Sequence, residues 1–234
     1  MLLLNGTLTE CPGLVHGKMG IAVFFFHYAK YTGNELFADY AMDLIGEMLN
    51  QIHVNSPADY ERGIVGIGVG IDYLIRSDFL KVEDDICEDF DQRMVRAVLY
   101  DPWTDFSKYG SLTGYGRYWM SRLRYQAPAE QARQCLLYII GLIEERLLDI
   151  SAEEQTDVYC FLQDLCSIQG FEMCKGLLAQ LKEQPVKDFS WTQIADLDRE
   201  KTPESTGLLN GYAGEGMLRL TAINQANKSW MHLL

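Results

Sequence analysis

The sequence is short of basic residues. Its 234 residues include 20 lysines and arginines against 33 aspartates and glutamates, which gives a formal net charge of −13. Binding to nucleic acid depends on clustered basic side chains that neutralise phosphates, so this deficit argues against a nucleic-acid partner. The charge favours a cationic or neutral partner instead.

Long apolar runs and paired cysteines are also missing. No apolar run approaches the length of a membrane span, and the N-terminal Met1-Leu2-Leu3-Leu4 is too short for a signal peptide and has no basic flank. The six cysteines form no C-x-x-C pair, which indicates reduced thiols rather than a disulfide scaffold. We therefore expect a cytoplasmic protein with no membrane span.

No stretch alternates polar and apolar residues with the period of a strand. The chain instead repeats one unit, a turn punctuated by glycines followed by an apolar helix. Four such turns are centred on Gly20, Gly66, Gly114 and Gly214, at intervals of 46, 48 and 100 residues. The last interval equals two periods with one repeat unmarked near residue 160. This self-similarity is typical of helical repeat proteins.

Each glycine turn is expected to open an inner helix, which an amphipathic outer helix follows. Near-continuous apolar character predicts inner helices at 17–31, 64–76, 112–124 and 212–225. One-sided apolar stripes predict outer helices at 35–52, 83–99 and 129–150, and a fourth pair is expected at 152–168 and 170–184. In the helix at 83–99, the acidic residues, Asp85 and Asp91 among them, are expected on the solvated face. The polar stretch 185–205 is expected to be a long loop around a short helix.

The predicted fold class is all-α. With 48% hydrophobic residues the chain can bury one sizeable core, and we expect residues 1–234 to form a single domain. Helical hairpins with a period of about 48 residues either stack into a solenoid or close into an α/α toroid. Glycines at the ends where inner helices converge favour the toroid, complete or incomplete.

Two segments resemble repeats of the lanthionine synthetase C-like family. They are Gly-Leu-Val-His-Gly-Lys-Met-Gly-Ile-Ala at 13–22 with Tyr-Thr-Gly-Asn at 31–34, and Gly-Leu-Leu-Asn-Gly-Tyr-Ala-Gly at 207–214. The resemblance covers most of the chain except about 150–205. It implies an α/α toroid of seven helical hairpins, whereas this chain has room for about five at its own period. A smaller or open ring would leave an apolar face for a partner or for a second copy in a homo-oligomer.

The resemblance also implies a chemistry. Family cyclases add cysteine thiols of a precursor peptide to dehydrated serines or threonines, using a zinc ion held by two cysteines and a histidine. The Cys-His-Gly position of the family reads Leu209-Asn210-Gly211 here, and neither leucine nor a neutral amide is a good zinc ligand. The first repeat, Val15-His16-Gly17, keeps a histidine but no cysteine. We therefore expect no zinc and no other cofactor, and we assign no catalytic residue.

The candidate binding residues stand in or beside the N-terminal turns of the inner helices, and we expect them at one end of the molecule: His16, Tyr115, Asn210, Tyr212 and Glu215. His27, in the middle of a helix, is interpreted as a structural imidazole, either in the core or on the surface. The implied function is a lanthionine synthetase C-like protein with a degenerate active site that binds a peptide or protein partner during peptide modification.

Two alternative functions remain open. The first is an active peptide-modifying cyclase with a metal-free site. The second is a carbohydrate-active α/α toroid that uses the carboxylates of Asp72 or Glu215, since paired carboxylates are the machinery of glycoside hydrolysis.

Overall fold

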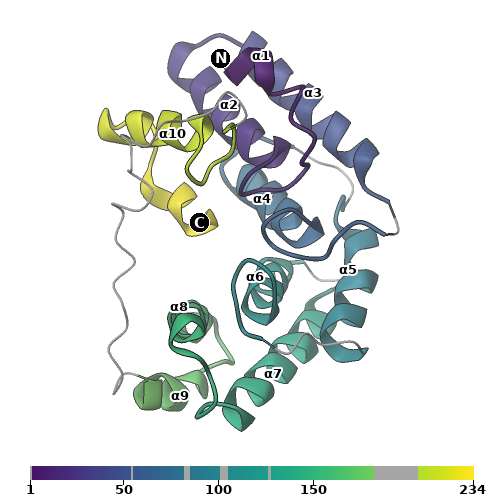
Figure 1. Ribbon diagram of the computed structural model, residues 1–234, viewed down its shortest axis with the longest axis vertical. Helices are drawn as coiled ribbons and strands as arrows, with labels where there is room; N and C mark the ends of the chain where they lie inside the picture. The colour runs from purple at the N-terminus through teal and green to yellow at the C-terminus, as the bar shows by residue number, and fades with distance from the viewer. Residues whose placement is uncertain (1, 54, 82–84, 101–104, 126–127, 182–204) are drawn as a thin grey trace. The chain divides into compact units, whose positions relative to one another are not determined.

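The computed structural model describes residues 2–53, 55–81, 85–100, 105–125, 128–181 and 205–234 (Figure 1). Within these ranges the chain forms helices and connecting loops, and no strand is present. This confirms the predicted all-α class. None of the helices in the described ranges is both long and apolar enough to cross a membrane.

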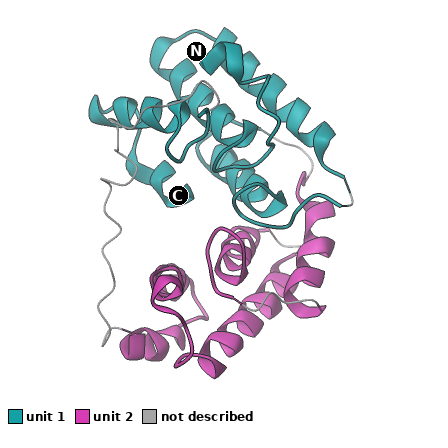
Figure 2. Cartoon of the chain, viewed as in Figure 1, with its two compact units in different colours: residues 1–84, 189–234 teal, residues 85–188 magenta. Residues whose placement is uncertain are grey.

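The chain divides into two compact units, which Figure 2 shows in different colours. The first unit comprises residues 1–84 and 189–234, and the second comprises residues 85–188. The first contains α1 (Leu2–Asn5), α2 (Lys18–Thr32), α3 (Leu36–Gln51), α4 (Ile64–Arg76), α10 (Tyr212–Ala222) and the 3₁₀ helix η3 (Lys228–Leu233). The second contains α5 (Glu88–Val95), the π-helix η1 (Arg96–Tyr100), α6 (Leu112–Arg122), α7 (Ala129–Glu145), α8 (Ala152–Cys166) and α9 (Cys174–Leu181). That residues 1–234 form a single domain stays a prediction.

Helix α2 is the central helix of the first unit, because apolar side chains cover nearly its whole circumference. It is buried along most of its length and packs against α3, α4 and α10 (Figure 1). The helix ends at Gly33, whose φ of 68° is left-handed and whose N–H donates to the Ala29 carbonyl at 2.9 Å. Glycine adopts this conformation without steric cost, so the Gly-Asn stop works as the sequence predicts.

The neighbouring helices show the burial that their patterns predict. Helix α4 is buried continuously over its first eleven residues, from Ile64 to Leu74. Helix α3 is buried on one side only, through residues spaced as a helical stripe, namely Ala41, Leu44, Ile45 and Met48. The first unit therefore places fully buried helices next to a half-exposed one.

The end of the chain belongs to the core of the first unit. After α10 the sequence predicts at most a stub, and the structure has η3 there. The indole of Trp230 is fully buried, and its Nε1 donates to Thr221 Oγ1 at 3.0 Å. The hydroxyl of Tyr60, in the turn before α4, donates to the carbonyl of Leu233 at 2.9 Å. These bonds tie η3 to two other elements of the unit.

The second unit follows the predicted order of helices with shifted boundaries. Helix α5 begins at Glu88 rather than 83 and continues as a π-helix from Arg96, and α7 ends at Glu145 rather than 150. Helix α8 begins with a capping box between Ser151 and Glu154. Helix α9 begins at Cys174 rather than 170, because Gly170 has a φ of 92° that no helix can include. The loop and short helix expected at 185–205 lie outside the described residues, except for Ser205.

Candidate functional site

The same turn precedes three helices of the first unit. Gly17, Gly63 and Gly211 stand immediately before α2, α4 and α10, each with an extended backbone. The N–H of the next residue donates to a carbonyl seven residues earlier in each case: Lys18 to Cys11, Ile64 to Pro57 and Tyr212 to Ser205, at 2.9, 3.0 and 2.9 Å. In the first unit, the repeated glycine turns of the sequence therefore share one loop geometry.

A second glycine in each helix is required by close backbone approach. A Cβ atom at Gly20, Gly66 or Gly214 would lie 2.2, 2.0 or 1.9 Å from the carbonyl oxygen of the residue six positions earlier. Such a separation is shorter than any van der Waals contact, so a side chain would force the loop away from its helix. These glycines hold each turn against the start of its own helix.

The three turns also lie side by side. The Val15 N–H donates to the Glu61 carbonyl at 3.2 Å, and the Val15 carbonyl accepts from the N–H groups of Leu208 and Leu209 at 2.8 and 3.1 Å. The turn before α2 therefore lies between the turn before α4 and the turn before α10. We call the surface formed by residues 11–17, 57–63 and 205–211 the turn face.

Two of the predicted residues stand at matching positions of adjacent turns. His16 and Asn210 each precede the glycine that opens a helix, and a Cβ at Gly207 would lie 2.5 Å from the His16 Cα. The His16 side chain is 41% exposed, with Nε2 3.3 Å from Glu61 Oε1. Partial burial lowers the pKa of His16, against the opposing effect of Glu61. Exposed Asn210 has a φ of 57°, a left-handed conformation that asparagine tolerates.

Two further predicted residues lie in the first turn of α10, directly after the turn face. The Tyr212 side chain is half-buried. The Glu215 carboxylate is only 20% exposed and forms an ion pair with Arg219, one helical turn later. The structure thus brings His16, Asn210, Tyr212 and Glu215 to the same end of the first unit.

The fifth predicted residue, Tyr115, belongs to α6 of the second unit. Its side chain is 1% exposed, so it contributes to the interior. The turn before α6 also departs from the glycine pattern, because Ser111 stands immediately before the helix and its hydroxyl donates to the Asp105 carbonyl at 2.5 Å. The binding roles of all five residues stay predictions.

The turn face and the start of α2 directly after it contain charged residues that the sequence reasoning did not single out. Glu61 and Arg62 occupy the positions that correspond to Val15 and His16, and their side chains form an ion pair at 3.4 Å. Lys18, the first residue of α2, is buried and pairs with Glu47 Oε2 at 2.6 Å. Applying the register of the repeated glycines to 57–63 would have found Glu61 and Arg62. No sequence signal links Lys18 to Glu47 on the following helix.

The side chains that could bind a metal ion lie apart from one another in the described residues. Over the described residues, no three His, Cys, Asp or Glu side chains are grouped so that they could hold a metal ion. The half-buried Cys11, which precedes His16 in the same turn, has a pKa raised by burial, so its thiol is protonated at neutral pH.

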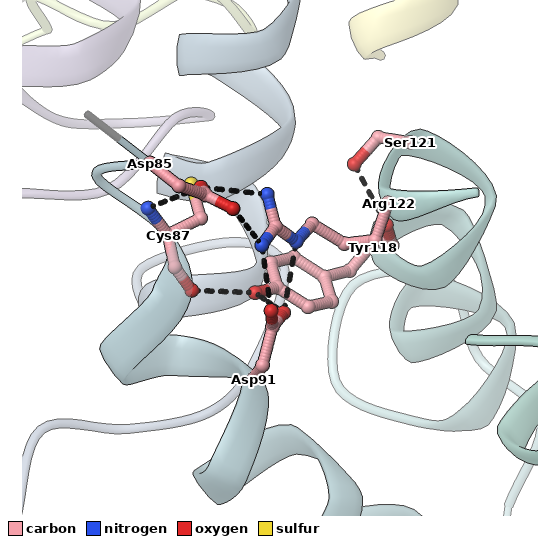
Figure 3. Close-up of polar contacts among 6 residues, drawn as sticks. All are labelled: Asp85, Cys87, Asp91, Tyr118, Ser121 and Arg122. Carbon is pink, nitrogen blue, oxygen red and sulfur yellow. Dashed lines mark hydrogen bonds and ion pairs between the residues drawn. The ribbon is translucent and has the colours of Figure 1, made fainter. Parts of the chain in front are cut away.

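The second unit contains a buried charged cluster, drawn in Figure 3, that joins α5 to α6. The guanidinium of Arg122 donates to both oxygens of Asp91, at 2.9 and 2.6 Å, and to both oxygens of Asp85, at 2.8 and 2.5 Å. The Tyr118 hydroxyl donates to Asp91 Oδ1 at 2.6 Å. Asp91 is 6% exposed, so its prediction as a solvated residue is wrong.

The partners explain why Asp91 is buried, and they also indicate a structural role. A carboxylate can leave water when charged donors occupy its oxygens, as Arg122 and Tyr118 do here. Burial, together with the neighbouring Cys87 and Asp91, raises the pKa of Tyr118. Burial alone would lower the pKa of Arg122, but the hydrogen bonds that Arg122 donates to Asp85 and Asp91 raise it. Both groups are therefore held in their protonated forms, which suits an anchor between helices better than proton transfer.

Four of the five predicted residues therefore lie together: His16 and Asn210 in the turn face, and Tyr212 and Glu215 in the first turn of α10 directly after it. They provide an imidazole, an amide, a phenol and a carboxylate, beside the ion pair of Glu61 and Arg62. Comparison of the chain with protein-family models, with curated proteins and with solved structures found no match.

Proposed function

We propose that this protein is a lanthionine synthetase C-like α/α toroid whose turn face binds an extended peptide or a protein partner, without zinc, in the maturation of modified peptides. The proposal extends to the period of about 48 residues as the repeat of the whole chain. The observation that supports it is the backbone pairing of the last glycine turn with the first through the Val15 carbonyl.

This pairing matters because of its position in the chain. In an open solenoid each repeat contacts only its neighbours in sequence, so the first and last repeats stay apart. Here the turn before α10 bonds to the turn before α2, which in turn bonds to the turn before α4. The order α10, α2, α4 is the order expected where the end of a ring meets its beginning.

The groups on the turn face and in the first turn of α10 fit a peptide. Asn210 and neutral His16 can both donate and accept hydrogen bonds, which suits the alternating N–H and C=O groups of an extended backbone. The half-buried ring of Tyr212 offers an amphipathic surface of the kind that is enriched in binding sites. The N-terminal ends of helices carry a partial positive charge that attracts anions. The carboxylates of Glu61 and Glu215 offset this positive charge, so a phosphate is a poor fit.

Binding to an array of synthetic dodecapeptides tests the proposal. We expect Tyr212→Ala to weaken binding of the selected peptides about tenfold, since truncation of a central aromatic residue typically costs more than 1 kcal/mol. Tyr31→Ala is the matched control, because Tyr31 is 46% exposed near the other end of α2. Equal binding by both variants and the unaltered protein would contradict the assignment of the site.

The metal-free cyclase is tested by thiol counting. Addition of a thiol to a dehydrated residue leaves the mass of the peptide unchanged, so the readout is alkylation of the thiols that remain after incubation with a dehydrated, cysteine-containing peptide. We expect every thiol to be alkylated, with no stoichiometric zinc bound to the protein. Loss of alkylation would establish the enzyme.

The carbohydrate alternative finds less support in the geometry. Asp72 lies two turns into α4 rather than in a glycine turn, is 5% exposed, and pairs with Arg76 at 2.9 Å. A buried carboxylate that already has a cationic partner is poorly placed to meet a sugar together with Glu215.

A further inference from the structure

A cavity of about 400 Å³ lies in the first unit at the end of α2 remote from the turn face. It is formed where α2 and α4 finish and α3 begins, by residues that include Ala29, Gly33, Ala38 and Ser77. A volume of this size is sufficient for a small organic group or a long side chain. None of its lining residues belongs to the turn face.

The floor of the cavity is aromatic. The rings of Phe26 and Phe79 stack with their centroids 5.6 Å apart, and both line the cavity. The ammonium group of Lys30 lies 5.6 Å from the centroid of Phe79, which is the geometry of a cation–π contact. The ring of Phe79 therefore already meets a cation supplied by the protein itself.

The charges at the rim are mostly negative. Glu35 and Asp78 line the cavity, and within the described residues neither carboxylate has an ion pair or a hydrogen-bond donor. Lys30 is the one basic residue of the lining. The C-terminal ends of α2 and α4, where a helix dipole is negative, lie at the cavity. Only α3 begins here, so only one helix contributes a positive end. Behind the floor, burial and the nearby Lys30 lower the pKa of His27 to about 4, so this imidazole adds no charge at neutral pH.

We propose that this cavity binds an organic cation, an alkylammonium or guanidinium group, with its apolar stem on Phe26 and its charged head between Phe79, Glu35 and Asp78. An aromatic face combined with carboxylates that have no cationic partner is the chemistry that recognises such cations. The site lies at the other end of α2 from the turn face, and it is independent of the peptide proposed there. The cation could be supplied by a free amine or by a lysine or arginine side chain of another protein.

The test uses three ligands of similar size and different charge. Titrations of n-butylammonium, n-butanol and butyrate are followed by the amide NMR signals of Gly33 and Phe79 in the whole protein. We expect saturable shifts with n-butylammonium and about tenfold weaker binding of the other two. Equal binding of butanol, or preferred binding of butyrate, would overturn the proposal.

Variants separate the carboxylates from the resident lysine. The double variant Glu35→Gln, Asp78→Asn should weaken n-butylammonium binding about tenfold, and asparagine suits position 78 because it tolerates the φ of 59° found there. Asp43→Asn, an exposed acidic position on α3 outside the cavity, is the matched control and should leave binding unchanged. If the double variant does not fold, Glu35→Gln alone should still show part of the loss.

Lys30 provides the sharpest discrimination. Since its ammonium competes for the face of Phe79, Lys30→Gln should tighten n-butylammonium binding several-fold. If the cavity instead bound anions through Lys30, the Lys30→Gln variant would lose all ligand binding. A second probe distinguishes the source of the cation. It is a short peptide with one lysine and an acetylated N-terminus, so that the lysine side chain is its only positive charge. Binding of the peptide as tight as that of the free amine identifies a side chain, and binding of the free amine alone identifies a small molecule.

Discussion

At the scale of single residues, His27 is the most informative side chain. It is 5% exposed, its Nε2 lies 2.7 Å from the Tyr73 hydroxyl, and its ring meets Phe79 edge-on at 4.7 Å between centroids. The sequence left open whether this structural imidazole lies in the core or on the surface, and the structure places it in the core. The consequence is a neutral imidazole in the core.

The first prediction concerns the pH dependence of stability. Because burial lowers the pKa of His27 from 6.5 to about 4, the unfolded chain binds a proton between these values that the folded chain does not. The contribution of His27 is therefore complete above pH 6.5 and is lost as the pH falls towards 4. Between pH 7 and 5 the free energy of unfolding should fall by about 2 kcal/mol from this group.

Urea unfolding at pH 7 and pH 5 measures this change, and His27→Gln serves as the comparison because glutamine can still bond to Tyr73. The difference in unfolding free energy between the two proteins should shrink with acidification. If it stays constant over this range, His27 does not titrate as described.

At the scale of helices, the glycine turns decide where the buried helices begin. The second prediction compares two glycines inside helices. Gly66→Ala places a Cβ 2.0 Å from the Tyr60 carbonyl oxygen and should lower stability by about 2 to 3 kcal/mol. Gly46→Ala in α3 meets no atom within 4 Å and should raise stability by up to about 1 kcal/mol through helix propensity. Thermal unfolding of both variants gives the answer, and shifts of the same sign would disprove the steric account.

The third prediction concerns the anchor between α5 and α6. Asp91→Ala removes the buried partner of Arg122 and Tyr118, so it should destabilise the protein by about 3 kcal/mol or more. The Asp85 side chain is 29% exposed, and water can replace part of its interaction, so Asp85→Ala should cost about 1 kcal/mol at most. Chemical denaturation of both variants tests the ranking, and a larger loss from Asp85→Ala would reverse it.

At the scale of the whole molecule, the pattern of glycines and apolar residues was sufficient to predict the helices. It was sufficient because each glycine turn is a local structure, coded within about ten residues of its helix. Long-range partners were not predictable in the same way. Asp91 was expected in solvent because nothing near it in sequence reveals Arg122, and the cavity beside Phe79 depends on the packing of three helix ends.

The candidate site was predictable to the same extent. His16 and Asn210 carry a local signal, since both precede a glycine that opens a helix, and their turns prove to be adjacent. The ion pairs of Glu61 and Glu215 depend on side-chain rotamers, which the repeat pattern does not encode. The ligand of the turn face was not predictable, because it is chosen by the combined arrangement of side chains from three turns that are distant in sequence.

The fourth prediction tests the C-terminal segment as a part of the core. Trp230 is fully buried, so Trp230→Ala should destabilise the protein by about 3 to 5 kcal/mol through lost apolar contact. Trp230→Phe keeps most of that contact and loses the bond to Thr221, and it should cost about 1 to 2 kcal/mol. Calorimetric unfolding of both variants provides the measurement, and a small effect of Trp230→Ala would mean that η3 docks only weakly.

The bonds from Leu208 and Leu209 to Val15 have a consequence for the order of events during synthesis. The ribosome makes the turn near residue 11 and the helices after it long before it makes the turn near residue 208. The first unit therefore cannot finish folding until its C-terminal segment has been synthesised. Until then the surface of α2 that receives α10, including the ring of Phe24 beside Gly216, is exposed on the nascent chain. Closing so long a loop is slow, and the waiting intermediate is the species that a chaperone would recognise.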